Sequence, residues 1–345
     1  MMKFLRISGQ DKLKLPYNLR SNQQEIIDTI EKGLHSNNHI VIEAPTGSGK
    51  TFTSLASSLP FVISKSYKIV YCVRTNSQQE QVIRELKAFK ESGNNFSVVA
   101  IQGRQSMCPQ QKDDDELAKS NWSEKSKICK SLKLQSKMGE AGCPYYRKLL
   151  RPTKSLIDRW SSEIYSAEEF TVNAESENLC PYELNKLLLK KAQIVIVPYV
   201  YFFEDFIRKY LLGWMDTTID KIITIVDEAH NLPDWSREAA SESLSVDSLH
   251  RASQESDKFG LLLGDGTPPT LFLDLVESAL KSLGEYHISE GDDEGLLPSH
   301  IVSLDSEVPT FETEMMSLGK MTLYRLKQQS SDLSKMGQLI RQTLL

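Results

Sequence analysis

Residues 40–51 read IVIEAPTGSGKT, an apolar run that passes into a glycine-rich turn and ends in a lysine–threonine pair. A strand, a turn of this kind and a following helix together form a phosphate-binding loop. Gly47 and Gly49 let the backbone curl, so that successive N–H groups point at phosphate oxygens. Residues 51–59 continue as a predicted helix, whose N-terminal dipole adds to the attraction. The stretch therefore predicts a nucleotide site on an α/β fold.

The side chains of this loop have separate predicted roles. Lys50 is expected to reach the β- and γ-phosphates of ATP, and Thr51 to offer its hydroxyl to Mg²⁺. Gln23, upstream in LRSNQQEII, is a candidate for reading the adenine edge by paired hydrogen bonds, although its spacing is better explained by an ordinary polar helix face. The predicted nucleotide contacts are Gln23, Thr46, Gly47, Ser48, Gly49, Lys50 and Thr51.

Further strand and helix patterns alternate along the chain. Residues 69–73 (IVYCV), 97–101 (SVVAI), 193–197 (QIVIV) and 222–226 (IITIV) are rich in β-branched residues, as buried parallel strands are. Residues 77–89 have helical period. This alternation predicts a parallel sheet with helices on both faces.

The last of these strands ends in two carboxylates, within IITIVDEAH at 222–230. Asp227 is expected to hold Mg²⁺ through water, and Glu228 to polarise the attacking water. Strand ends of open α/β sheets are where ligands bind. His230 is a candidate for coupling nucleotide state to the rest of the protein. We predict Lys50, Asp227 and Glu228 as the catalytic residues.

Composition and charge are those of a globular protein with an uneven charge distribution. The 345 residues are 40% hydrophobic and 25% charged, with a net charge of −5. The net charge is +6 over residues 1–104, zero over 105–205 and −11 over 206–345. The front of the chain is therefore suited to face phosphates, and the rear is not. No apolar run is long enough for a bilayer, and no secretory signal opens the chain, so we expect a cytoplasmic monomer.

The alternating pattern stops between residues 105 and 190, where we expect a mostly helical insertion. Four of the five cysteines lie here: Cys108, Cys129, Cys143 and Cys180. The intervening lengths of 20, 13 and 36 residues differ from the close pairs of most structural zinc sites. Three of these cysteines precede proline, as ligands of iron–sulfur ferredoxins also do. An iron–sulfur cluster, a zinc site and unligated thiols all remain open, whereas Cys72 is predicted to be a core residue.

Residues after about 235 show no strand–helix alternation. In the stretch 270–283 (TLFLDLVESALKSL), Phe272, Val276, Ala279 and Leu283 fall on one helical face. Residues 290–295 (EGDDEG) read as an acidic loop. We therefore expect a mainly helical C-terminal segment.

Together these motifs resemble the XPD family of superfamily 2 helicases, in its archaeal form. The resemblance rests on APTGSGKT at 44–51, VRTNSQ at 73–78, the four cysteines, VPYVYF at 197–202 and VDEAHNLPD at 226–234. It covers roughly residues 15–235 with specific motifs, and the remainder by position only. The resemblance implies an ATP-driven 5′→3′ DNA helicase that acts on single-stranded or forked DNA in DNA repair.

The resemblance also implies a domain plan and a set of site residues. Residues 1–104 and 191–235 would form a RecA-like helicase domain, 105–190 a 4Fe–4S domain, and 236–345 a truncated, mainly helical Arch-like domain. Cys108, Cys129, Cys143 and Cys180 would ligate the cluster. Arg104 matches a position that supports the cluster. The residues expected near DNA are Arg74, Thr75, Asn76, Arg104 and Tyr199. The four tyrosines Tyr145, Tyr146, Tyr199 and Tyr201 are weaker candidates that would stack on bases, and packing inside the protein is an equally good interpretation of them.

The sequence departs from the family in one respect. No motif follows DEAH that resembles the second motor domain, which in the family completes the ATP site with an arginine finger. We therefore expect the 345-residue chain to bind ATP weakly and not to unwind DNA by itself. Two other readings remain open, a non-motor module that binds DNA or a partner protein and a different P-loop ATPase with a zinc site.

Overall fold

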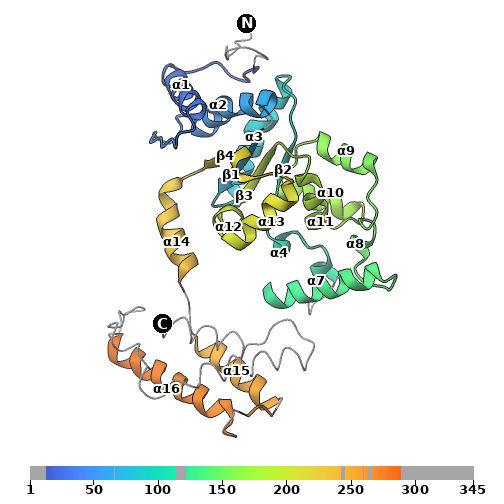
Figure 1. The fold of residues 1–345 in the computed structure, drawn as a ribbon, viewed down its shortest axis with the longest axis vertical. Helices are drawn as coiled ribbons and strands as arrows, with labels where there is room; N and C mark the ends of the chain where they lie inside the picture. The colour runs from blue at the N-terminus through green and yellow to red at the C-terminus, as the bar shows by residue number, and fades with distance from the viewer. Residues whose placement is uncertain are drawn as a thin grey trace. The chain divides into compact units, whose positions relative to one another are not determined.

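A computed structural model describes residues 13–65, 67–113, 122–241, 245–258, 260–262 and 266–288 of the chain (Figure 1). The chain divides into two compact units, residues 1–231 and 232–345. The predicted boundaries at 104, 190 and 235 stay predictions. Among the described residues, no helix combines the length and the apolar character that a membrane span requires.

The first unit is built on a four-stranded sheet. Its strands are β1 (Lys68–Val73), β2 (Val98–Ala100), β3 (Ile194–Pro198) and β4 (Ile222–Val226), in the order β2-β3-β1-β4. All three pairings are parallel, with Val70 opposite Val195 and Thr224, and Val98 opposite Ile194. The four predicted strands are thus confirmed. Strands from before and after the insertion pair directly, so the sheet resumes where the sequence predicted.

Helices and the loops between them surround this sheet in the described first unit. They are α1 (Ser21–His35), α2 (Lys50–Lys65), α3 (Asn76–Glu91), α4 (Arg104–Met107), α5 (Gln110–Asp113), α7 (Trp122–Lys137), α8 (Pro144–Arg147), α9 (Lys154–Ser162), α10 (Ala167–Ser176), α11 (Pro181–Leu189), α12 (Tyr199–Phe203) and α13 (Asp205–Met215), with 3₁₀ turns at Ile219–Lys221 and Ala229–Asn231. The described residues between β2 and β3 contain helices and no strand.

The core lies against one face of the sheet, beneath α1, α2 and α3. Alternate residues of a strand point to one face, and Ile69 and Tyr71 of β1 join the same cluster as Leu55 of α2 and Leu86 of α3. All four side chains are less than 2% exposed. The opposite set of β1, which includes Cys72, is buried as well, and α11 and α12 pack against the strands. Cys72 is therefore a core residue, as predicted.

The segment 40–43 differs from its prediction, because it forms no strand. Val41 is 95% exposed and Ile42 is 36% exposed. The run makes no ladder with β4, whose outer edge stays unpaired within the described sheet. As a result β4 is only half-buried, and Thr224 faces solvent, whereas the sequence predicted a buried strand. Four apolar residues without a partner strand do not by themselves determine a strand.

The second unit has three described helices, α14 (Leu232–Ala240), α15 (Val246–Lys258) and α16 (Pro269–His287). Helices α15 and α16 pack together, and Leu249, Leu273 and Val276 are buried. The helix predicted over 270–283 is confirmed. The side chains of Ala279 and Leu283 and the predicted loop at 290–295 lie outside the described residues.

Candidate functional site

The loop before α2 has the backbone that phosphate binding requires. Gly47 and Gly49 have φ values of 79° and 86°, in the left-handed region that favours glycine. A Cβ atom on Gly49 would lie 2.4 Å from Nε2 of Gln23, so a larger residue here would strain the backbone and displace that amide. Thr51 is 7% exposed in the first turn of α2, and Thr46 is exposed on the loop. The N-terminus of a 16-residue helix thus follows a curled loop, as an anion site needs.

Two residues from the start of α1 hold this loop in place. Arg20 donates from Nη1 to the carbonyl of Gly47 at 3.0 Å, and Gln23 donates from Nε2 to the carbonyl of Ser48 at 2.9 Å. The Gln23 Oε1 accepts from the Arg20 N–H at 3.0 Å, and the side chain is 6% exposed. The amide is engaged at both of its polar atoms. Gln23 therefore has a visible role in shaping the loop, and the adenine contact stays a prediction.

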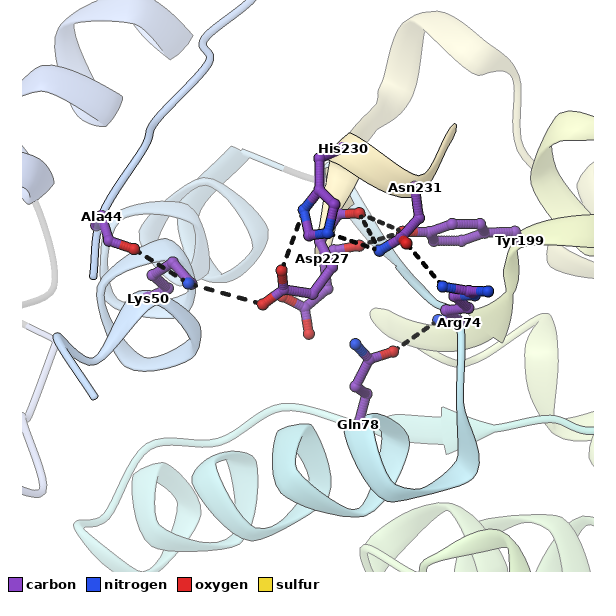
Figure 2. Close-up of polar contacts among 9 residues, drawn as sticks. Ala44, Lys50, Arg74, Gln78, Tyr199, Asp227, His230 and Asn231 are labelled. Carbon is purple, nitrogen blue, oxygen red and sulfur yellow. Dashed lines mark hydrogen bonds and ion pairs between the residues drawn. The ribbon is translucent and has the colours of Figure 1, made fainter. Parts of the chain in front are cut away.

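The DEAH segment reaches the same loop from the end of β4. Asp227 continues the β1 pairing through its N–H, which donates to the Cys72 carbonyl at 3.0 Å. Lys50 Nζ lies 3.6 Å from Glu228 Oε1 and donates to the Ala44 carbonyl at 3.2 Å (Figure 2). The structure therefore brings together a cation and two carboxylates that are far apart in the sequence, at the carboxyl edge of the sheet.

The pKa of the Asp227 carboxyl is raised above its usual range, by burial and then by the neighbouring charge of Glu228, while Lys50 opposes the shift. Two carboxylates this close repel each other when ionised. A magnesium ion at Asp227, as the sequence predicts, would supply the missing positive charge and would need ionised oxygen ligands. We therefore expect any affinity for Mg²⁺ to fall as the pH falls through this raised pKa, at a higher pH than for an ordinary aspartate.

Replacing Asp227 by Asn is expected to raise the thermal stability of the ligand-free protein and to weaken its binding of Mg²⁺. The folded state disfavours the ionised carboxylate, so the neutral amide should raise the Tm of the ligand-free protein by about 1–3 °C at neutral pH. The same change removes a charged oxygen from the magnesium position. Thermal denaturation with and without ATP–Mg²⁺ measures both effects, and a lower Tm without ligand would contradict this account of the pKa shift.

The candidate DNA segment lies at the end of β1, on the N-terminal turn of α3. Arg74, Thr75 and Asn76 are all exposed. The Thr75 hydroxyl accepts from the Gln78 N–H at 3.3 Å and caps α3, and Asn76 Oδ1 accepts from Gln102 Nε2 at 3.1 Å. Exposed polar groups at the start of a long helix are suited to phosphate oxygens.

Tyr199 lies elsewhere in the site than the sequence predicted. Its side chain is 2% exposed, so its ring offers no face on which a base can stack. Its hydroxyl instead donates to the backbone carbonyls of Asp227, at short range, and of Glu228, at 3.2 Å. Tyr201 is likewise buried and donates to the Gln102 carbonyl at 3.0 Å. We therefore do not retain either tyrosine as a DNA contact.

Asn231 is a site residue that the sequence reasoning missed. Its Oδ1 accepts from Nη1 of Arg74 at 2.7 Å, and its Nδ2 donates to the Glu228 carbonyl at 3.1 Å (Figure 2). The only signal in the sequence is its place directly after DEAH. Nothing in that position shows that the amide joins two motifs from different strands.

The four cysteines of the insertion surround one cavity. Cys108 precedes α5, Cys129 lies on α7, Cys143 precedes α8, and Cys180 precedes α11. All four line the same cavity, which Arg104, Lys133, Tyr145, Tyr146, Tyr182 and Glu183 also line. The fold thus gathers thiols of which even consecutive ones are separated by up to 36 residues of sequence. Tyr145 and Tyr146 belong to this cavity.

Arg104 faces this cavity as well. Its Nη1 donates to Ser126 Oγ at 3.0 Å, and its guanidinium lies 5.0 Å from the centre of the Tyr182 ring. Its Nε is buried and has no hydrogen-bond partner among the described residues. A buried cationic donor without a partner is costly in a closed cavity.

Burial raises the pKa values of Cys108 and Cys129, and that of Cys180 to about 12. These thiols hold their protons until a cation displaces them. Within the described ranges, no three Cys, His, Asp or Glu side chains are close enough to hold a single metal ion. The iron–sulfur cluster and the zinc site therefore both stay predictions for this cavity.

Glu183 forms a buried charge cluster at the edge of this cavity. Its two oxygens lie 2.7 Å from Lys133 Nζ and 3.1 Å from Lys186 Nζ, and its side chain is 11% exposed. Burial alone would raise the pKa of Glu183, but Lys186 and Lys133 outweigh it and lower the pKa overall. The cluster therefore contributes stability above the usual glutamate pKa and loses it as the pH falls through the lowered value.

Removing Glu183 is expected to destabilise the protein, because two lysines whose side chains are only 20% exposed lose their counter-ion. Glu183→Ala should lower the free energy of unfolding at neutral pH by about 2–4 kcal/mol, measured by urea denaturation. Glu177→Ala is the matched control, since its ion pair with Arg159 is largely exposed and should contribute less than about 1 kcal/mol. Equal losses in the two variants would contradict the prediction.

Comparison with known proteins places these features in a family. Residues 71–249, more than half of the chain, match the family model DEAD_2. The chain is 27% identical over 239 residues to the ATP-dependent DNA helicase XPD of Sulfolobus acidocaldarius, covering 69% of this chain and 37% of that protein. It is 26% identical over 240 residues to the general transcription and DNA repair factor IIH helicase subunit XPD/RAD3 of Saccharomyces cerevisiae, covering 65% and 30%.

Solved structures give the same relationship at the level of the fold. A chain described as XPD_Helicase matches with a TM-score of 0.54 and 22% identity, covering 94% of this chain and 51% of that one. A chain described as Truncated XPD matches with a TM-score of 0.51 and 22% identity, covering 92% and 80%. The chain spans about a third of the length of the two curated relatives. It belongs to the DEAD_2 family, the XPD/Rad3-type helicase domain.

Proposed function

We propose that this chain is the ATP-binding and cluster-binding part of a 5′→3′ DNA helicase of XPD type that serves DNA repair. The observation that carries the proposal is the 3.6 Å separation of Lys50 Nζ and Glu228 Oε1, which joins the phosphate loop to the DEAH segment. A curled loop, a lysine and two carboxylates at one sheet edge are the parts that phosphoryl transfer uses.

Each residue of the site has a role that follows from its position. Lys50 binds the β- and γ-phosphates and is released from the Ala44 carbonyl to do so. Thr51 and Asp227 would hold Mg²⁺, which when bound would supply positive charge beside the phosphates. Glu228 orients and polarises the attacking water. Gln23 and Arg20 hold the loop open for the nucleotide from the start of α1.

DNA is proposed to bind at the carboxyl end of β1. Arg74, Thr75 and Asn76 are exposed at the N-terminus of α3, where backbone N–H groups and the helix dipole favour a phosphate. Residues 1–104 carry a net charge of +6, which favours a polyanion in this part of the chain. The segment 236–345 is acidic and is proposed to lie off the DNA path.

The insertion is proposed to hold a 4Fe–4S cluster on Cys108, Cys129, Cys143 and Cys180, with Arg104 as its cationic neighbour. A bound cluster supplies fixed links between four helical segments and a net negative charge. The support is the shared cavity and the buried, partnerless Nε of Arg104. In this proposal residues 105–190 form the cluster domain, and 236–345 belong to an Arch-like domain.

Strand displacement on two partial duplexes tests the proposal, one with a 5′ single-stranded tail and one with a 3′ tail. A protein that joins this chain to a second motor domain should separate only the 5′-tailed duplex, and only with ATP and Mg²⁺. The 345-residue chain alone should bind ATP and single-stranded DNA without separating either duplex. Robust unwinding by the chain alone, or displacement of the 3′-tailed duplex, would contradict the proposal.

A further inference from the structure

The backbone of Glu228 is held in an unusual conformation. Its φ of 49° lies in the left-handed region, which a residue with a Cβ enters only at a cost. Such conformations persist where surrounding contacts determine them, and they are frequent at active sites. The side chain of Glu228 also lies 3.6 Å from Lys50 Nζ. The contacts that hold this residue are therefore a means of positioning its carboxylate.

Three donors converge on the Glu228 carbonyl. They are the Asn231 N–H at 3.0 Å, the Asn231 Nδ2 at 3.1 Å and the Tyr199 hydroxyl at 3.2 Å. The Tyr199 hydroxyl also donates to the Asp227 carbonyl. Two side chains thus hold the backbone at both acidic residues.

Asn231 also contacts two other side chains, Arg74 and His230. Its Oδ1 accepts from Arg74 Nη1 at 2.7 Å, which connects it to the candidate DNA segment. Its Nδ2 lies 3.2 Å from His230 Nε2, and His230 Nδ1 lies 3.3 Å from Glu228 Oε2.

One assignment of protons satisfies every contact of this set. Asn231 Nδ2 donates one hydrogen to the Glu228 carbonyl and the other to His230 Nε2. His230 then carries its proton on Nδ1 and donates it to the Glu228 carboxylate. Figure 2 shows this continuous line of contacts from Arg74 through Asn231 and His230 to the ATP side of the sheet edge.

We propose that Tyr199 and Asn231 are positioning residues that couple DNA binding at Arg74 to the placement of the Glu228 carboxylate. A phosphate that draws the Arg74 guanidinium away removes the donor from Asn231 Oδ1. The amide is then free to turn, and its two contacts toward Glu228 change with it. This inference rests on the proposed function, because it needs both an ATP site and a DNA site.

The test is a linkage measurement on the 345-residue chain. The affinity for ATP–Mg²⁺ is titrated with and without saturating oligothymidylate, and the ratio of the two dissociation constants is the coupling factor. For the unaltered chain we expect a factor of about 5 to 150 in either direction. Tyr199→Phe removes one hydroxyl, and Asn231→Ala removes the bridge. Each should bring the factor to within about twofold of one, while each ligand alone still binds.

A matched control comes from a tyrosine two residues further along the same helix. Tyr201→Phe also removes a buried hydroxyl that donates to a backbone carbonyl, that of Gln102, but outside this set of contacts. It should leave the coupling factor unchanged, which a general loss of packing would not. Asn231→Asp keeps the acceptor for Arg74 and loses both donors, so it should also lose the coupling.

The possible outcomes distinguish a failure of the proposed function from a failure of the proposed coupling. A chain that binds neither ATP nor oligothymidylate would contradict the proposed function itself. A chain that binds both with a coupling factor of one, or whose factor survives in Tyr199→Phe and Asn231→Ala, would overturn this inference and leave the proposed function standing. Retained coupling in Asn231→Asp would confine the effect to Arg74 and would equally overturn the proposed path to Glu228.

Discussion

Replacing Lys50 by Ala is expected to weaken binding of ATP–Mg²⁺ by about 10- to 100-fold. A charge-assisted hydrogen bond contributes about 1.5–3 kcal/mol, which corresponds to this range. Lys50 is also the cation nearest to Glu228, at 3.6 Å, and it lowers the pKa of Asp227. Its loss leaves the two carboxylates without a counter-charge at the position where phosphates must bind. Titration with a fluorescent ATP analogue measures the change.

Two controls make this result specific. AMP has neither a β- nor a γ-phosphate, so its affinity should change by less than about twofold in Lys50→Ala. Lys87→Ala removes a partly exposed lysine of the same unit, whose ion pair with Glu169 lies away from the loop, and should leave ATP affinity unchanged. An equal loss for ATP and AMP would show that Lys50 acts through folding and would contradict the assigned role.

Replacing Cys129 by Ser is expected to remove the cluster from an anaerobic preparation. The unaltered chain should carry about four iron and four labile sulfide with visible absorbance, and the variant less than about one of each. A thiolate is the ligand that such clusters require, and Cys129 lies on α7 at the shared cavity. Because metal binding adds to folding free energy, the Tm of the variant should also fall by several degrees.

Cys72→Ala is the matched control for this experiment. Cys72 lies in β1 with no exposed surface and does not line the cavity. Its replacement should leave iron and sulfide unchanged, although loss of packing can lower the Tm. Zinc without sulfide in the unaltered chain would contradict the cluster and favour the P-loop ATPase with a zinc site, and full iron content in Cys129→Ser would contradict the ligand assignment.

The sheet was predictable because the residue composition of each strand segment by itself indicates a strand. The runs at 69–73, 193–197 and 222–226 consist mainly of β-branched residues, and each becomes a strand. The run at 40–43 has similar letters and forms none, because a strand also needs a neighbour with which to pair. A single sequence specifies the side chains of a segment but not whether a pairing edge lies beside it.

Part of the chemistry of the site was also predictable, because some of its residues belong to short local motifs. Lys50 and Glu228 belong to short motifs whose residue types are required by phosphate and water, so each could be named before the fold was known. The roles of Tyr199 and Asn231 could not, because they arise from the meeting of β1, β3 and β4 at one edge. The sequence does not show whether a tyrosine ring is buried or exposed for stacking on a base. Only the structure gives that burial.

The cysteines are an intermediate case. The number of cysteines, and a spacing that differs from the close pairs of most zinc sites, could be read from the sequence. These features indicated a group of metal ligands but not its geometry. The shared cavity depends on how α5, α7, α8 and α11 pack. The partnerless Nε of Arg104 is a feature that only the packed structure reveals.

The central claim is that the phosphate loop and the DEAH segment form one ATP–Mg²⁺ site on this chain. Calorimetric titration of ATP into the 345-residue chain, once with Mg²⁺ and once with a chelator, tests this claim most directly. The account predicts saturable binding of one ATP per chain that is at least about tenfold tighter with Mg²⁺, and loss of that difference in Asp227→Asn. Absence of saturable binding, or an affinity that is the same with and without Mg²⁺, would contradict it.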